Sequence, residues 1–212
     1  LDEISQSYTQ NVIVEPFDIS DIEGVAKHLE SLKERMGGVD LLIHCSGAGS
    51  RNIALSLEEE LRIINTNILG FTAVMNWAFL YFQERGEGHL AAISSIAGLR
   101  GFALSPSYSS SKSFQMKYLE ALRQKGHNMG KKITVTDIRA GFVDTDMGNG
   151  AGAFWQATPQ RAANQIVVGI NAKKDILYVT KRWRGVAWIM NIFPSSLFKR
   201  LNFPATKDSN SI

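Results

Sequence analysis

The sequence predicts an α/β fold, in which a parallel, doubly wound sheet carries helices on both faces. Two observations lead to this prediction. Five short apolar runs alternate with longer segments of helical periodicity, an alternation typical of βαβ units. The short runs are apolar on both faces, as strands are when helices cover a sheet on either side. No repeat or low-complexity linker divides the 212 residues, so we expect a single domain.

Each element follows from a local pattern. Strands are expected over residues 11–17, 39–45, 88–94, 132–138 and 175–179. Helices are expected over residues 20–36, about 57–84, 107–126 and 158–173. Ser20 and Thr158 are the expected N-caps, because a hydroxyl there can accept a hydrogen bond from a first-turn amide. Gly126 is the expected C-cap, and residues 1–180 are expected to form the domain to which residues 181–212 add a C-terminal tail.

Composition limits the class of protein. Hydrophobic residues make up 44% of the chain, which is ample for a packed core. The single cysteine, Cys45, excludes an internal disulfide and a cysteine-only metal site, and it fits a reducing compartment such as the cytoplasm. The histidines are scattered, so no metal site is predicted. No stretch approaches the roughly 20 uninterrupted apolar residues of a membrane span.

The formal net charge of +3 is unevenly distributed. Residues 173–207 hold eight Lys or Arg against one acid, Asp175. A nucleic-acid partner is one interpretation of this basic end, but the chain has no recognised nucleic-acid motif and no basic run longer than two lysines. We therefore expect a solvated basic surface and no nucleic-acid partner.

Tyr108 and Lys112 lie four positions apart in the predicted helix 107–126, so their side chains share one face. The strand before them ends near Ser95, at the carboxyl end of the sheet, where open α/β sheets bind ligands. An adjacent ammonium favours the phenolate, so we expect a lowered pKa for Tyr108 and a usable acid and base. A pair on a solvated helix face is the alternative interpretation.

Longer motifs point to one family. The segments "AAISSIAGLRGFALSPSYSSSK" (91–112), "INTNILG" (64–70), "FDISD" (17–21) and "IRAGFVDTDM" (138–147) occur in the order and at the intervals of that family's motifs. From about residue 8 to about residue 180 the chain resembles a short-chain dehydrogenase/reductase. The resemblance implies a Rossmann-like fold and reversible hydride transfer between NAD or NADP and a small carbonyl or alcohol substrate.

The resemblance also implies roles for individual residues. Tyr108 would pass the proton, Lys112 would hold the ribose, Ser95 would bond the substrate oxygen, and Asn67 would fix a water that links Lys112 to solvent. Asp18 would bond the adenine. The remaining implied cofactor contacts are Ile19, Ser46, Gly47, Ala48, Gly141, Val143 and Thr145.

Structural roles compete with these functional ones. Ser95 can be an ordinary strand-end serine, and Asn67 can cap or kink its helix. Asp18 can cap the next helix, and Thr145 can cap a helix that begins near Asp146.

The chain departs from the family pattern at three places. His44-Cys45-Ser46-Gly47 replaces the usual Asn-Asn-Ala-Gly, and Ala140 replaces a proline. The glycine-rich turn that holds the pyrophosphate does not precede residues 11–17, which match the family's third strand. We therefore expect the natural protein to have a further N-terminal segment, because in the order 3-2-1-4-5-6 the first two strands fill a gap of roughly 14 Å. The choice between NAD and NADP stays open, since the selecting residue follows the second strand.

The tail, residues 181–203, combines apolar side chains such as Trp183, Trp188 and Phe193 with basic ones, and Pro194 divides it. It is expected to close over a hydrophobic substrate or to form a subunit contact in a homodimer or homotetramer. Peripheral attachment to a membrane is the alternative, since tryptophan beside basic residues suits an interface. At the level of function, the alternative to an enzyme is a catalytically silent or truncated binding or scaffold protein of the same family.

Overall fold

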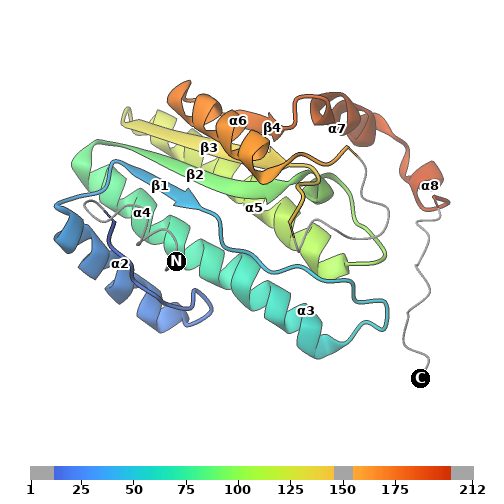
Figure 1. Ribbon diagram of the computed structural model, residues 1–212, viewed down its shortest axis with the longest axis horizontal. Coiled ribbons are helices and arrows are strands. Elements are labelled where there is room, and N and C mark those ends of the chain that lie inside the picture. Colours follow the sequence, from blue (N-terminus) through green and yellow to red (C-terminus); the bar gives the residue numbers. More distant parts are fainter. Residues whose placement is uncertain (1–11, 146–154, 202–212) are drawn as a thin grey trace.

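A computed structural model describes residues 12–145 and 155–201 of the chain. Its sheet has four parallel strands in the order β1-β2-β3-β4. The strands are β1 (Leu41–His44), β2 (Glu87–Ser95), β3 (Lys132–Ala140) and β4 (Ile176–Val179). The predicted parallel α/β sheet is thus confirmed, and four of the five predicted strands are present within a few residues of their expected bounds (Figure 1).

Helices cover both faces of the sheet (Figure 1). On one face lie α2 (Ile22–Met36), α4 (Phe71–Arg85) and α5 (Pro106–Asn128), and on the other lies α6 (Pro159–Asn171). The alternation along β2 explains the two layers. Leu90 and Ala92 are buried with the first group of helices, whereas Ala91 between them is buried with α6.

The remaining elements are α3 (Leu57–Ile64), the π-helical segment η1 (Asn65–Gly70), the short 3₁₀ helix η2 (Ile96–Leu99), α7 (Trp183–Ile192) and α8 (Ser195–Phe198). Pro194 separates α7 from α8, as its fixed geometry predicts. Trp183, expected on the surface of the tail, is instead buried, and its ring centroid lies 5.7 Å from that of Phe142. The correction follows from position, since Trp183 begins α7 directly after β4 and faces the body of the domain.

The helix that runs through α3, η1 and α4 is 29 residues long, with a mean hydropathy of 1.3 over its most apolar window. By length and composition alone it could cross a membrane, which the sequence did not suggest because polar residues interrupt its apolar runs. The buried share of that window is 44%, and Phe71, Phe79 and Phe82 pack in the core beside the sheet. Core helices of soluble proteins pass the same test.

The first predicted strand, residues 11–17, is wrong over its described part: residues 12–17 have no strand structure. Among the described residues, no strand lies beside this stretch to complete its backbone pairing. It packs on α2 instead, where the Glu15 carboxylate lies 3.0 Å from His28 Nδ1 and 2.7 Å from Arg35, and Phe17 stacks on His28. A run of β-branched residues forms a strand when a neighbouring strand is present.

Two of the three predicted caps are also corrected. Asp21, not Ser20, caps α2, and its carboxylate accepts a hydrogen bond from Gly24. Gly126 lies inside α5, buried against β3, and the helix continues to Asn128. Thr158 caps α6 as expected, because its hydroxyl accepts from the amide of Arg161 at 3.3 Å.

Candidate active site

Three of the predicted catalytic groups meet at the carboxyl end of β2. Ser95 ends the strand, and Tyr108 and Lys112 lie in the first two turns of α5. Ser95 lies close enough to the Tyr108 phenol to act on its pKa, and Lys112 Nζ lies 5.8 Å from the centroid of the Tyr108 ring. Gly98 makes this proximity possible, because a Cβ there would lie 2.6 Å from the Lys112 backbone. The strand and the helix can therefore present their side chains to one another.

Lys112 is buried with its charged end bonded to the protein. Its Nζ donates to the Ile93 carbonyl of β2 at 3.0 Å and to Gln115 Oε1 at 3.0 Å. Burial lowers the pKa of Lys112 to about 8, and the negative charge of Asp137 acts in the opposite direction. The ammonium form is thus favoured up to slightly alkaline pH.

Tyr108 behaves differently from the sequence expectation. Burial raises its pKa above the ordinary value, and the nearby Ser95 hydroxyl only partly opposes this. The expected lowering assumed that the adjacent ammonium dominates, whereas here Lys112 is bonded to Ile93 and Gln115 and desolvation is the larger influence. Tyr108 is therefore a neutral phenol in this state, with a proton to donate.

Asn67, the fourth predicted group, lies in η1 and is fully buried. Its Oδ1 accepts from the Ala48 amide at 2.7 Å, while its Nδ2 donates to the Ala48 carbonyl at 2.7 Å and to Ser111 Oγ at 3.0 Å. The side chain thereby holds the turn after β1 against α5. Whether it also orders a water near Lys112 stays a prediction.

A cavity of about 590 Å³ lies between the turn after β1 and residues 16–19. Four of the predicted cofactor residues line it, namely Asp18, Ile19, Ser46 and Gly47. Pro16, Phe17 and Thr66 complete the lining. Asp18 also serves its alternative role as a turn residue, since it accepts from the Ser20 amide at 2.8 Å, a bond that helps to lower its pKa. Thr66 was not anticipated, because it lies outside the Asn-x-x-Gly motif.

Gly47 shows that the cavity can admit a cofactor close to the catalytic groups. A Cβ at this position would lie 3.5 Å from both Lys112 Nζ and Asn67 Oδ1. A larger side chain would fill the space in front of the ammonium. The absence of a side chain at Gly47 therefore keeps the space between the cavity and Lys112 open to a ligand.

The other predicted contacts follow β3. Gly141 donates to the Val179 carbonyl at 2.6 Å, and a Cβ there would clash with the Trp183 ring at 2.0 Å. Val143 forms a β-bridge with Ala157, and Thr145 Oγ1 donates to the Val143 carbonyl at 3.4 Å. They lie at the same edge of the sheet as Ser95, which pairs with Ala140. The helix start proposed near residue 146 lies outside the described residues.

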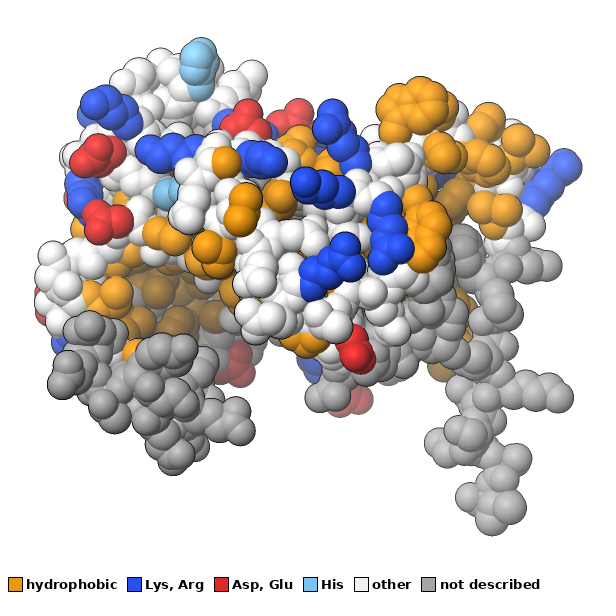
Figure 2. Space-filling model, turned by 45° about the horizontal axis from the view of Figure 1, so that its top comes forward, with side chains coloured by type: hydrophobic (Ala, Val, Ile, Leu, Met, Phe, Trp, Pro, Cys, Tyr) orange, Lys and Arg blue, Asp and Glu red, His pale blue; other side chains and the backbone are white. Residues whose placement is uncertain are grey.

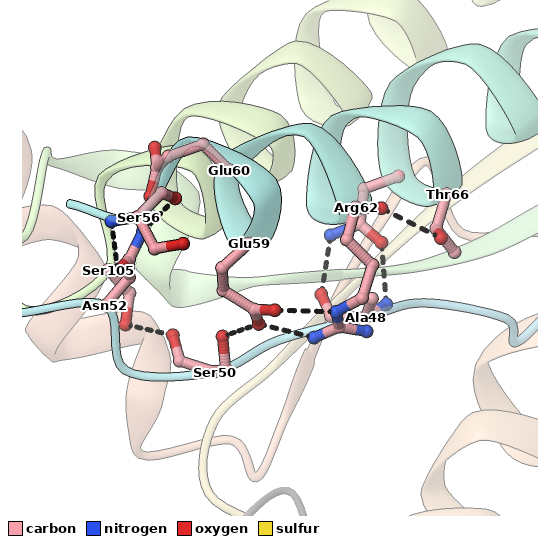
Figure 3. A network of polar contacts seen from close by, with 10 residues as sticks. Ala48, Ser50, Asn52, Ser56, Glu59, Glu60, Arg62, Thr66 and Ser105 are labelled. Carbon is pink, nitrogen blue, oxygen red and sulfur yellow. Dashed lines mark hydrogen bonds and ion pairs between the residues drawn. The ribbon is translucent and has the colours of Figure 1, made fainter. Parts of the chain in front are cut away.

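A polar network fixes the loop that follows the cavity (Figure 3). Buried Asn52 accepts from the Ser56 amide at 2.8 Å and donates to Glu60 at 2.7 Å. Ser105 Oγ donates to the Ser50 carbonyl at 2.7 Å, which joins the loop to the start of α5. The loop is therefore held against the start of α5, the helix that carries Tyr108.

Sequence comparison identifies the family of this chain. The family described as short chain dehydrogenase matches residues 1–154. The chain belongs to this family. An oxidoreductase of Myxococcus xanthus described as uncharacterized is 34% identical over 146 residues, which cover 67% of this chain and 57% of that protein. A dehydrogenase/reductase SDR family protein 7-like of Anopheles gambiae is 27% identical over 206 residues, covering 90% and 64%.

The chain spans about three fifths of the length of these curated relatives. Among solved structures, a short chain dehydrogenase from Burkholderia cenocepacia in complex with NADP has a TM-score of 0.76 and 19% identity. The likeness covers 90% of this chain and 80% of that one. At that identity it shows the Rossmann-like fold alone.

The sequence patterns assigned no role to two buried polar residues near Lys112, Gln115 and His44. Gln115 contacts both Lys112 and the Asn67 backbone. His44 packs edge-on against Phe71, and its Nε2 has no hydrogen-bond partner in the part of the chain that the structure describes. Burial and the charge of Lys112 lower the pKa of His44 to about 4, so the ring is neutral at physiological pH. The departure from asparagine marked His44 as unusual, whereas nothing in the sequence distinguished Gln115.

Among the described residues, no cluster of three potential metal ligands occurs.

Proposed function

We propose that this protein is an NAD- or NADP-dependent oxidoreductase that interconverts a carbonyl compound and an alcohol. The observation that carries the proposal is the meeting of Ser95, Tyr108 and Lys112 beside a cavity lined by Gly47. A phenol, a hydroxyl and an ammonium at one sheet edge can bind a substrate oxygen and move its proton.

The bound nicotinamide would supply the hydride in reduction and accept it in oxidation. Tyr108 would donate its phenolic proton to the carbonyl oxygen during reduction and take a proton back from the alcohol during oxidation. Its neutral state suits it for the first of these steps. Ser95 would donate to the substrate oxygen as negative charge develops, and Lys112 would stabilise the phenolate left on Tyr108.

The same proposal assigns the cofactor contacts. Lys112 would bond the ribose, Asp18 the adenine, and the turn from Ser46 to Ala48 would border the sugar. Gly141, Val143 and Thr145 would lie along the nicotinamide carboxamide. NADP is the first coenzyme to test, since the Burkholderia cenocepacia structure contains it and a Schizosaccharomyces pombe relative is named an NADP-dependent 3-hydroxy acid dehydrogenase.

Titration of the protein with NADH and with NADPH, followed by nicotinamide fluorescence, tests the proposal. Saturable binding of either one supports an oxidoreductase, and the tighter of the two identifies the coenzyme. Binding of neither contradicts the proposal and favours the alternative, a catalytically silent binding or scaffold protein.

We also propose a hydrophobic substrate. The tail is docked on the segment before Tyr108, because Arg100 donates to the Phe193 carbonyl at 3.0 Å and lies 4.5 Å from the ring centroid of Phe198. In a series of linear ketones, kcat/KM should then rise by about 3- to 4-fold for each added methylene that enters the site, equivalent to about 0.8 kcal/mol. A flat series would contradict an apolar site.

The place of action and the assembly are proposals of the same kind. We propose a cytoplasmic homodimer or homotetramer, and light scattering at micromolar concentration measures its mass. A monomer throughout that range would contradict the oligomer.

Peripheral membrane contact is a second proposal, carried by α7. Trp188, Ile189 and Ile192 share one side of that helix and are 66%, 53% and 60% exposed. Figure 2 shows hydrophobic side chains gathered at this end of the molecule, with Lys and Arg side chains beside them. Apolar and basic groups in this arrangement suit an anionic bilayer surface. Co-sedimentation with anionic liposomes at physiological salt should be lost in Trp188→Ser, and a wild type that does not sediment would rule this out.

A further inference from the structure

Gln115 lies one turn after Lys112 on α5 and is 1% exposed. Its Oε1 accepts a hydrogen bond from Lys112 Nζ at 3.0 Å, and its Nε2 donates to the backbone carbonyl of Asn67 at 2.9 Å. One carboxamide therefore joins the buried ammonium to the backbone of a different helix.

The Asn67 carbonyl is available because the helix is wide at this point. In an α-helix the amide of Phe71 would donate to Asn67. Here it donates to the carbonyls of Thr66 and Ile68 instead. A buried carbonyl needs a partner, and Gln115 supplies it. The π-helical turn and Gln115 thus satisfy each other.

The ammonium has three donors, and the described residues occupy two of them. Ile93 accepts one and Gln115 accepts another. Gly47 borders the side toward the cavity, where a Cβ would lie 3.5 Å from Nζ. One N–H is left for a ligand that enters the cavity.

We infer that Gln115 is a positioning residue for Lys112: it holds the ammonium in its charged form and leaves one N–H for the cofactor ribose. The part that concerns the ribose rests on the proposed function, whereas the effect on the Lys112 charge does not. A fixed carboxamide replaces a solvent molecule at this face of the ammonium, and unlike water it does not exchange.

Within residues 12–145 and 155–201, three other titratable groups lie near Lys112. Asp137 of β3 is ion-paired with Arg139 and accepts from Ser94, so its negative charge is shared. His44 at the end of β1 is neutral above a pKa of about 4. Tyr108, on α5 itself, is a neutral phenol. These groups are unchanged by substitution at position 115, so a shift in Lys112 titration reports on the carboxamide.

The experiment titrates Lys112 directly. The ¹³Cε resonances of labelled lysines are followed with pH in the full chain without cofactor, and Lys112→Met identifies the relevant signal. Gln115→Met keeps the size but removes the acceptor, and it should lower the Lys112 midpoint by about one to two pH units. Gln115→Glu keeps an acceptor and adds a negative charge, so it should raise the midpoint. Gln124→Met, an exposed position on the same helix, is the matched control and should change nothing.

Opposite shifts in the two variants would establish the positioning role, since a merely structural role gives no reason for opposite signs. Unchanged midpoints in both folded variants would overturn it. If Gln115→Met does not fold, Gln115→Glu decides: a raised midpoint supports the inference, and an unchanged or lowered one overturns it. If Lys112 bonds the ribose, NADPH affinity should fall as the ammonium loses its proton, and the pH of this fall should shift with the Lys112 midpoint. A wild type that binds neither NADH nor NADPH would contradict the proposed function, but the titration of Lys112 would still test the role of Gln115.

Discussion

The two sides of the candidate site are held in place in different ways. On the side of β2 and α5, Lys112 and Asn67 are buried and bonded to the backbones of other elements. On the side of residues 12–19, Asp18 bonds to Ser20 two residues away, and the segment rests on α2 without strand structure. The proposed proton-transfer groups are therefore preorganised by the sheet, while the proposed adenine contact depends on local turn geometry.

The largest expected effect is on the packed side and concerns chemistry. Tyr108→Phe removes the transferable proton and should lower kcat by about 10²- to 10⁴-fold, the usual contribution of a general acid. Affinity for the coenzyme should stay within about 2-fold, since loss of a hydroxyl leaves the ring that packs there. Steady-state kinetics and fluorescence titration measure the two quantities. Tyr118→Phe, on the same helix, is the control, and comparable turnover in the two variants would remove Tyr108 from proton transfer.

The packed side should also be sensitive to acid through His44. Burial holds its pKa at about 4 in the folded protein, below the ordinary value of 6.5, so the unfolded chain binds the proton more readily. The stability linked to this group is complete above pH 6.5 and is lost as the pH falls toward 4, by about 3 kcal/mol over that range.

Urea unfolding at pH 7 and pH 4.5 measures this loss, which His44→Leu should reduce by removing the titrating ring. His127→Leu alters an exposed histidine of α5 and should keep the wild-type dependence. Equal acid sensitivity in wild type and His44→Leu would show that His44 is not the cause.

Asn67→Ala tests the joint between the packed side and the cavity. It removes three hydrogen bonds and leaves both backbone groups of Ala48 without this partner, so unfolding free energy should fall by about 2 kcal/mol. Asn76→Ala changes an exposed asparagine of the same continuous helix and should cost under about 0.5 kcal/mol. Chemical denaturation compares the two variants, and equal stabilities would mean that the turn after β1 does not depend on Asn67.

The smallest effect is expected on the other side. Asp18→Ala should change stability by under about 0.5 kcal/mol, since Asp18 is exposed to solvent in its hydrogen bond with Ser20. It should nonetheless weaken NADH or NADPH binding several-fold if the carboxylate bonds the adenine. A loss of stability as large as that of Asn67→Ala would erase the difference between the two sides.

Much of this architecture could be predicted from the sequence. The period of the apolar residues located the helices, and the fixed spacing of Ser95, Tyr108 and Lys112 predicted that they would meet. The strand predicted over residues 11–17 was wrong because β-branched residues indicate a preference for sheets but do not show whether a neighbouring strand is present. The cap of α2 moved from Ser20 to its neighbour Asp21, a shift of the size that local patterns often leave unresolved.

The electrostatics were harder to predict. Tyr108 was expected to ionise more easily because a lysine lies one turn away, but the direction of that lysine's bonds is a property of the packed structure. The role of Gln115 could not be predicted either, since it depends on the Asn67 carbonyl that the π-helical turn of η1 leaves available. Propensity scales carry no signal for such a turn.

That wide turn also determines how the two halves of the long helix face their surroundings. This turn holds one residue more than an α-helical turn, because the Phe71 amide reaches back five residues to Thr66. In a regular α-helix, one additional residue would rotate everything after it by about 100°. Phe71 and Met75 would then swing away from the sheet while Ile63 stayed in place. The wide turn absorbs the additional residue, so both halves of the helix keep their apolar side chains on the core.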